Sequence, residues 1–285
     1  MRPRRIDAHH HFWDPADFDY PWMAGDAMDP VRRAFTPEDL APELEANTID
    51  GTVLIQTVSD LDETTQFLQL AETTPFVRGV VGWVDLTDGR TDGTLAALDE
   101  RFPGQLVGIR HQVHDETDAA WLDRPDVRTG VEAVGSAGLA YDLLVRTREL
   151  PSAIRLVSDL PDQRFVLDHI AKPPIADGWS PDWARLIGEL AERPNVAVKL
   201  SGMVTEANWD DWNADTLRPY AEHVLEVFGT DRVLFGSDWP VCLLAASGYS
   251  QVVDTVTELL AGLSQDEEAD TLGGNAIRWY RLEND

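Results

Sequence analysis

Two histidines near the start of the chain are spaced so that both can reach one metal ion or one substrate oxygen. His9 and His11 lie in the segment Asp7-Ala8-His9-His10-His11, at the end of an apolar stretch. Alternate side chains of a strand share a face, which predicts that these two imidazoles point together and that His10 points away. Residues two apart on a strand are separated by about 7 Å, so two rings can converge on one ion.

A third histidine and a lysine follow a later apolar run. His169 lies near the end of residues 165–170 and is predicted to complete a three-histidine site. Asp168 is predicted on the opposite face of that strand, where it would fix strand ends or orient a neighbour. Lys172 precedes two prolines, a rigid turn that would hold its ammonium over the site. A structural histidine and a solvated lysine are the alternatives.

An aspartate follows the last apolar run of this kind. Gly236 and Ser237 precede it and are small, which lets the chain pass closely there. In a closed barrel the eighth strand lies beside the first, so Asp238 would lie close to His9. A carboxylate at that point can bind a metal, accept a proton from water, or do both in turn. The alternative role is a helix N-cap.

Residues predicted to bind a substrate end other apolar runs or follow them. Arg110 offers a fixed fork of donors to a carboxylate or to hydroxyls, and Gln56 ends an earlier run. His111 is also a candidate, although neighbours in a pleated strand point to opposite faces. Trp13 and Trp239 offer flat rings that suit the C–H face of a sugar. An arginine paired with a helix carboxylate, and tryptophans that only pack in loops, are the alternatives.

The elements that must position these residues are short apolar runs separated by longer amphipathic stretches. This alternation is typical of βαβ units and a parallel sheet. Helix start signals such as Thr36-Pro37 and Ser180-Pro181 fall between the runs. Strands are predicted over residues 5–12, 51–57, 77–85, 106–112, 139–145, 164–170, 195–201 and 232–237.

Eight strands with intervening helices predict an α/β fold, a (β/α)₈ TIM barrel in which residues 1–285 form one domain. A doubly wound sheet is the alternative, but it often carries a glycine-rich phosphate loop after its first strand. Here that turn reads His-His-His-Phe-Trp. The polar residues described above lie at the carboxyl ends of predicted strands, which converge on one mouth in a barrel.

Composition limits the classes of partner. A formal net charge of −28 argues against nucleic acid and anionic membrane surfaces, because phosphates would be repelled. Cys242 is the only cysteine, so an intramolecular disulfide is excluded. No apolar run is long enough to span a bilayer, and the N-terminal segment lacks an apolar signal core. We therefore expect a cytoplasmic protein that acts on a small molecule, with homo-oligomer formation left open.

Together, several motifs resemble the amidohydrolase 2 group of the amidohydrolase superfamily. They are Asp-x-His-x-His at 7–11, Leu-Asp-His at 167–169 with Lys-Pro at 172–173, Lys-Leu-Ser-Gly at 199–202 and Phe-Gly-Ser-Asp-Trp-Pro at 235–240. Gly-Ile-Arg-His at 108–111 and Phe-Trp-Asp-Pro at 12–15 are most similar to the L-fuconolactonase-like branch of sugar lactonases. The resemblance runs from residue 4 to about residue 282.

The resemblance implies a catalytic centre of His9, His11, His169 and Asp238. The same four residues are the implied ligands of one divalent ion, zinc or manganese, and catalysis without a metal is also compatible with this group. Members with two metals carry a bridging lysine or glutamate after the fourth strand, or extra histidines on the middle strands. The fourth predicted strand here ends Arg110-His111, so a second ion is not expected.

The activity implied is hydrolysis of a sugar lactone by an activated water. Asp238 would take the proton of the water, and the three imidazoles would polarise the carbonyl oxygen directly or through the ion. Substrate contacts would come from a wider set: Gln56, Arg110, His111, Lys172, Trp13 and Trp239. The alternatives are a related barrel decarboxylase, another ester or amide hydrolase of the superfamily, and a carbohydrate-binding barrel without catalysis.

Overall fold

Eight parallel strands form one sheet in which each strand pairs with the next along the chain. The computed structural model describes residues 2–282. The strands are β1 (Ile6–His10), β2 (Gly51–Ile55), β3 (Val77–Gly82), β4 (Leu106–His111), β5 (Ala140–Leu143), β6 (Phe165–Leu167), β7 (Val196–Leu200) and β8 (Val233–Phe235). Each lies within a predicted strand, because near-continuous apolar runs suit strands that are buried on both faces.

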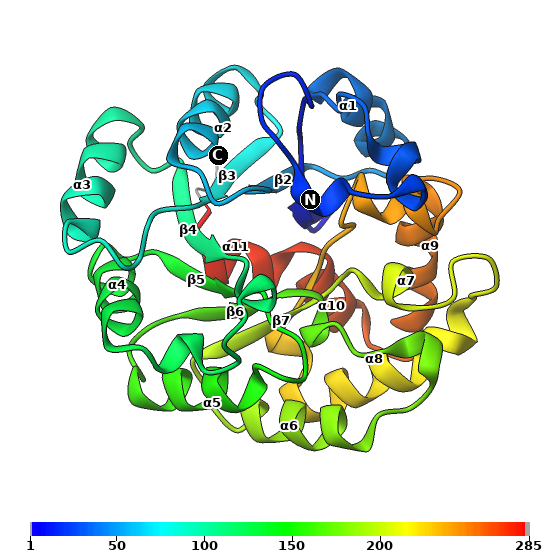
Figure 1. The fold of residues 1–285 in the computed structure, drawn as a ribbon. Coiled ribbons are helices and arrows are strands. Elements are labelled where there is room, and N and C mark those ends of the chain that lie inside the picture. Colours follow the sequence, from blue (N-terminus) through cyan, green and yellow to red (C-terminus); the bar gives the residue numbers. More distant parts are fainter. Residues whose placement is uncertain (1, 283–285) are drawn as a thin grey trace.

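Helices surround the strands, as the view along the barrel in Figure 1 shows. The α-helices are α1 (Pro37–Ala46), α2 (Leu61–Thr73), α3 (Thr91–Arg101), α4 (Pro125–Ser136), α5 (Leu150–Asp159), α6 (Pro181–Ala191), α7 (Met203–Glu206), α8 (Ala214–Phe228), α9 (Tyr249–Leu259), α10 (Gln265–Ala269) and α11 (Asn275–Tyr280). Shorter helical segments cover Pro21–Met23, Asp26–Val31, Val113–Asp115, Trp121–Asp123, Asp168–Ala171, Ile175–Asp177, Thr230–Arg232, Val241–Leu244 and Asp270–Gly274. Within residues 2–282, no helix has the length and apolar character needed to cross a membrane.

Hydrogen bonds between the first strand and the segment after the last strand close the barrel. The amide of Asp238 donates to the carbonyl of His9 (2.8 Å), and the amide of His11 donates to the carbonyl of Trp239 (2.7 Å). The buried carboxylate of Asp7 strengthens this seam by accepting from the amide (2.9 Å) and the hydroxyl (2.6 Å) of Ser237. The predicted (β/α)₈ barrel is therefore confirmed. The predicted domain, 1–285, extends to residues 1 and 283–285, which lie outside the described residues.

A bulge in β1 decides where its histidines point. The register with β2 shifts between Asp7 and His10. Ala8 belongs to the apolar cluster inside the barrel, and His9 also points inward, where its Nδ1 lies 3.2 Å from Lys199 Nζ. An extra residue in a strand re-aims the side chains that follow it. The bulge thus lets the strand begin with an apolar interior face and end with two inward histidines.

Strand β6 ends earlier than predicted, at Leu167. The next residues form a turn in which four successive non-glycine residues, His169 to Lys172, have φ values between 46° and 60°. The prediction that the strand continues to residue 170, with Asp168 on its opposite face, is wrong because this left-handed turn breaks the alternation. Asp168 and His169 both reach the interior of the barrel mouth. Left-handed backbone in non-glycine residues costs about 1–3 kcal/mol each, and such residues cluster at active sites and ligand clamps.

Candidate active site

Three imidazoles and one carboxylate meet at the mouth of the barrel. The Nε2 atoms of His9 and His11 are 3.2 Å apart. Asp238 Oδ1 lies 3.4 Å from His11 Nε2 and 3.8 Å from His9 Nε2. The same oxygen is 3.8 Å from His169 Nε2. The structure therefore brings together the four residues that the sequence predicted as the centre, although His9 lies on β1, His11 directly after it, His169 after β6 and Asp238 after β8.

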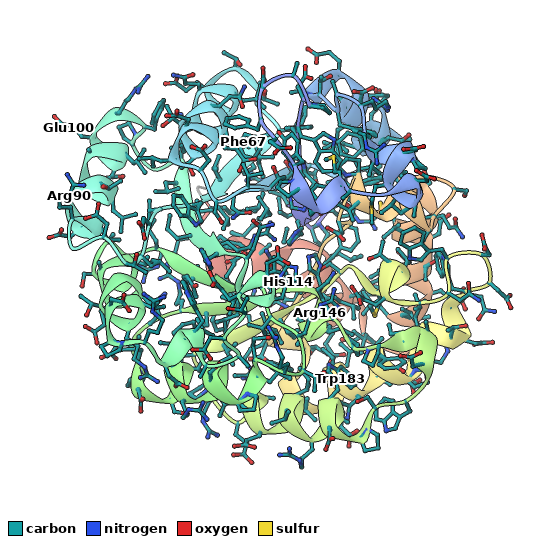
Figure 2. The ribbon with its side chains drawn as sticks, viewed as in Figure 1. Phe67, Arg90, Glu100, His114, Arg146 and Trp183 are labelled. Carbon is teal, nitrogen blue, oxygen red and sulfur yellow. The ribbon has the colours of Figure 1, made fainter. Side chains whose placement is uncertain are left out.

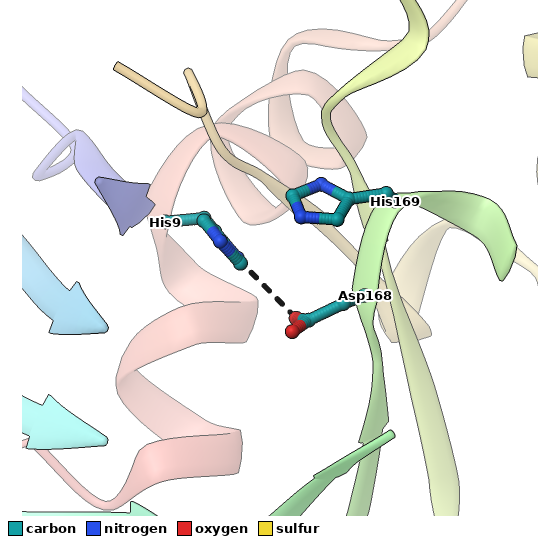
Figure 3. A group of neighbouring side chains, drawn as sticks. All are labelled: His9, Asp168 and His169. Carbon is teal, nitrogen blue, oxygen red and sulfur yellow. Dashed lines mark ion pairs between the residues drawn. The ribbon is translucent and has the colours of Figure 1, made fainter. Parts of the chain in front are cut away.

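The other nitrogen of each imidazole is held by the surrounding protein. His11 Nδ1 donates to the carbonyl of Ile55 (2.8 Å), and His169 Nδ1 lies 2.9 Å from Ser201 Oγ. His9 Nδ1 lies 3.3 Å from Asp168 Oδ1, the ion pair drawn in Figure 3. Such contacts fix the orientation of a ring and leave its Nε2 for a ligand. Each of the three Nε2 atoms lies within 3.8 Å of Asp238 Oδ1.

The donor set fits one divalent metal ion. Two ligand atoms at zinc distances of about 2.0–2.1 Å in tetrahedral geometry are about 3.4 Å apart. The separations of 3.2, 3.4 and 3.8 Å among the atoms of His9, His11 and Asp238 are close to that value. Neutral imidazoles and a carboxylate are also the ligand types of catalytic zinc.

Burial gives these groups the protonation states that the chemistry requires. It lowers the pKa of His9, His11 and His169 below the ordinary value of 6.5, so the imidazoles are neutral at pH 7. Burial would raise the pKa of Asp238, but His169 and His11 outweigh it and the pKa lies below 3.8. The centre thus combines an ionised carboxylate with neutral rings.

A cavity opens over the centre. Its lining residues are His11, Trp22, Thr57, Arg110, Gln112, His114, Asp115, Leu144, His169, Lys172, Asp238 and Val241. Figure 2 shows His114 near the middle of the barrel mouth, with Arg146 beside it in the view. Of the residues predicted to bind a substrate, Arg110 and Lys172 line this cavity.

Both cations of the cavity wall are already paired. Arg110 donates to Asp168 Oδ2 (3.0 Å) and to Gln56 Oε1 (3.0 Å). Lys172 Nζ lies 2.7 Å from Glu206 Oε1, and Glu206 also pairs with Arg146. Gln56 is fully buried and contacts Arg110, so it supports the arginine from behind.

The remaining predicted substrate contacts lie behind or beside the cavity wall. Trp13 is buried, donates from Nε1 to the carbonyl of Val31 (3.0 Å) and packs edge-on against Trp22. Trp239 packs against Phe35 with ring centroids 5.3 Å apart. The pair Trp13 and Trp239 thus forms the aromatic packing under the mouth, and Trp22 supplies the ring that faces the cavity.

His111 lies in a neighbouring hollow that shares Gln112, Asp115 and Trp22 with the cavity. Its ring stacks on Trp121 at 4.2 Å, and its Nε2 lies 2.8 Å from Glu116. It points away from Arg110, as the alternation along β4 requires. These contacts hold the His111 ring in place, and its predicted contact with a substrate stays a prediction.

A buried charged cluster under the centre was not predicted from the sequence. We call it the Lys199 cluster, and it contains Lys199, Asp142, Asp168 and Tyr280. Lys199 Nζ lies 2.6 Å from Asp142 Oδ2 and 2.8 Å from Asp168 Oδ1, with all three side chains fully buried. The Tyr280 hydroxyl donates to Asp142 (2.6 Å). The sequence did contain a signal for this cluster. Asp142 and Lys199 are charged residues within predicted apolar strands, and a buried charge is costly unless it is paired.

Comparisons with known proteins cover nearly the whole chain. A family model described as amidohydrolase matches residues 6–282. An L-fucono-1,5-lactonase of Burkholderia ambifaria is 39% identical over 286 residues, 98% of this chain and 96% of that protein. An L-fucono-1,5-lactonase of Burkholderia multivorans is 37% identical over 293 residues, 99% of this chain and 97% of that protein. A crystal structure of an amidohydrolase from Burkholderia multivorans with bound zinc has a TM-score of 0.91 at 36% identity, covering 98% of this chain and 100% of that one.

Proposed function

We propose, from the premise that this chain belongs to the amidohydrolase family, that Asp238 and the three central histidines are the catalytic groups of a sugar lactonase. The chain is a hydrolase of sugar lactones, as its relatives at 39% and 37% identity over nearly their full length are. Among such lactones we propose the L-fucono-1,5 type as the first substrate to test. The observation that carries the residue assignment is a buried carboxylate of the cavity lining, Asp238, with three imidazole nitrogens within 3.8 Å of its Oδ1.

The carboxylate of Asp238 acts as the general base. It takes a proton from the attacking water as the water oxygen bonds to the lactone carbonyl carbon. The carbonyl oxygen gains negative charge in that step, and the guanidinium of Arg110, which lines the cavity with Nη1 3.3 Å from His9 Nε2, would stabilise that charge. The ring C–O bond then breaks, and Asp238 returns the proton to the leaving ring oxygen. One carboxylate therefore serves both steps.

The four central residues would also hold the metal. When bound there, a divalent ion supplies Lewis-acid polarisation of the carbonyl oxygen. Arg110 and Lys172 line the same cavity and would bind hydroxyls of the lactone and the carboxylate of the product. Their donors are partly engaged by Asp168 and Glu206, which orients both side chains toward the cavity.

The rate acceleration that lactone hydrolysis requires is modest. A lactone is an activated ester, so a positioned general base, typically about 10²–10⁴-fold, supplies a large share of the acceleration. Preorganised donors at the oxyanion add about 10²–10³-fold.

A panel of aldonolactones tests the function directly. We expect release of one acid equivalent for each lactone consumed, followed by a pH indicator, with the highest kcat/KM on a 1,5-lactone of a deoxy sugar. Carboxylated aromatic acids serve as the comparison set, since a barrel decarboxylase would release CO₂ from them. CO₂ release without any lactone turnover would favour the decarboxylase alternative.

The pH profile follows from the shifted pKa values. Each imidazole, and the Asp238 carboxylate, becomes protonated when the pH falls below its own pKa. The pKa values of the three imidazoles lie below 6.5, and that of Asp238 lies below 3.8. We therefore expect kcat/KM to stay level between about pH 6 and 8, after subtraction of spontaneous hydrolysis. An acid limb centred at the ordinary histidine pKa would contradict the assignment of buried, neutral rings.

Three wider expectations are also part of this proposal. Residues 1–285 are proposed to form one domain, which a single cooperative unfolding transition would support. A cytoplasmic location and a small-molecule partner are proposed from the single cysteine and the charge of −28. The oligomeric state is open to direct measurement by light scattering.

A further inference from the structure

Lys172 lines the cavity, and its positive charge is matched by a carboxylate that lies behind the lining. Lys172 Nζ is 2.7 Å from Glu206 Oε1, and each of the two side chains is only 13% exposed. Lys172 belongs to the left-handed turn after β6, and Glu206 is the last residue of α7, after β7. Arg146, after β5, lies 3.2 Å from the other oxygen of Glu206. One carboxylate therefore connects the ends of three neighbouring strands.

Glu206 balances the charge of Lys172 but does not use all of its donors. An ammonium has three N–H donors, and Glu206 is its one charged partner within residues 2–282. Hydroxyl groups of a ligand can accept from the remaining donors without bringing a charge into the cavity. A carboxylate of a ligand would instead compete with Glu206 for the ammonium and would meet a like charge beside it, which is unfavourable. This part of the wall therefore favours an uncharged ligand with many hydroxyls.

The other charged groups of the lining leave no spare positive charge. Arg110 is already paired with Asp168 at 3.0 Å. Asp115 and Asp238 contribute two carboxylates to the same lining. Burial is the largest cause that lowers the pKa of His114 to about 3, so this lining ring is neutral at pH 7. Each of the two cations of the lining thus has a carboxylate partner, and two further carboxylates face the cavity.

We propose that Glu206 is a positioning residue that sets the charge specificity of the cavity. Through its pair with Lys172, it makes the site select lactones of uncharged sugars against lactones that carry a second carboxylate. The inference rests on the proposed function for the reaction, and it names the class of lactone that the site accepts. Hydrolysis creates a carboxylate at the former carbonyl carbon of either class, so only a carboxylate elsewhere on the sugar distinguishes them.

Two lactones that differ in one group test this specificity. Glucono-1,4-lactone ends in a CH₂OH group, and glucaro-1,4-lactone has a carboxylate in its place. Both are assayed with the wild type and with Glu206→Gln at one zinc concentration, so that an ion at the centre affects both alike. We expect the wild type to prefer the gluconolactone. Glu206→Gln should raise kcat/KM for the glucarolactone about tenfold, mainly through KM, because the freed ammonium gains a charge-assisted hydrogen bond.

Two further variants show whether this gain acts through Lys172. Arg146→Gln removes the other partner of Glu206 and leaves the pair with Lys172 intact. Its ratio of the two kcat/KM values should stay within about fivefold of the wild-type ratio, because pairs of exposed side chains contribute little. The double variant Lys172→Gln/Glu206→Gln lacks the freed ammonium and should lose the gain. If Glu206→Gln does not fold, Glu206→Ala, which leaves room for water beside Lys172, takes its place.

Binding measured without turnover separates this inference from the lactonase assignment. Calorimetry in the Asp238→Asn background, which lacks the general base, compares the Kd of the glucarolactone with and without Glu206→Gln. We expect Glu206→Gln to bind it about tenfold more tightly. This shift together with lactones that are inert toward the wild type would count against the proposed function alone. An unchanged Kd, or a gain that persists without Lys172, would overturn the proposal and leave Glu206 a structural link between strand ends.

Discussion

Replacement of Asp238 by Asn is expected to lower kcat by about 10²–10⁴-fold, the usual contribution of a positioned general base. The amide has nearly the same shape as the carboxylate, but it cannot accept the proton of the attacking water. The loss should be measured in chelator-treated enzyme as well as with zinc. Asp238 is also a metal ligand candidate, and only the metal-free measurement isolates its role as a base.

Asp115→Asn is the matched control for this variant. Asp115 is a carboxylate of the same cavity lining, but its side chain is 59% exposed and pairs with His114 rather than with the central rings. We expect its kcat to fall by less than about tenfold, as for a group that does not move the reacting proton. Turnover of Asp238→Asn near that of the wild type would remove the general base from the mechanism.

The strand pattern was sufficient to predict where the histidines of β1 would meet the aspartate after β8. Neighbouring first and last strands follow from barrel closure, and His9 and His11 share a face two residues apart. The pattern did not contain the bulge between Asp7 and His10. Strict alternation would have put Ala8 and His9 on opposite sides, whereas both are inside. Bulges depend on pairing with a neighbouring strand, which a single sequence does not display.

The positions of Asp168 and of the Lys199 cluster could not be predicted from the sequence for a different reason. The left-handed turn after Leu167 contains no glycine among residues 168–172, so no local residue type announces it. The surrounding packing imposes this backbone. Lys199 likewise reads as an interruption in an apolar strand until Asp142 of β5 and Asp168, which follows β6, are seen to reach it. Partners that lie far apart in the chain are supplied by the tertiary fold alone.

The sequence could not show which aromatic residue of the first long loop faces the cavity. Trp13 and Trp239 are buried, whereas Trp22 lines the cavity. A flat ring serves equally as a platform for a sugar and as packing under a loop. The path of the loop between β1 and α1 decides between these roles, and the sequence of that loop has no periodic pattern from which the path could be predicted.

Gly202→Ala is expected to lower kcat by about 10²-fold with a smaller effect on KM, since small misplacements of a catalytic group can cost that much. A Cβ at this position would lie 2.5 Å from His169 Nδ1 and 2.7 Å from its Cγ. The imidazole must therefore leave its present position, in which it contacts Ser201 and Asp238. Gly202 also has a φ of 62°, so the substitution carries a backbone cost that must be separated from the displacement of the ring.

Gly178→Ala provides that separation. Gly178 has a φ of 90°, and no atom of the described chain lies within 4 Å of the added Cβ. Both variants should therefore lose thermal stability through strained backbone, while only Gly202→Ala should lose turnover. The comparison uses kcat and the unfolding midpoint of each protein at one zinc concentration. A kcat for Gly202→Ala that matches Gly178→Ala would mean that His169 tolerates displacement without loss of turnover.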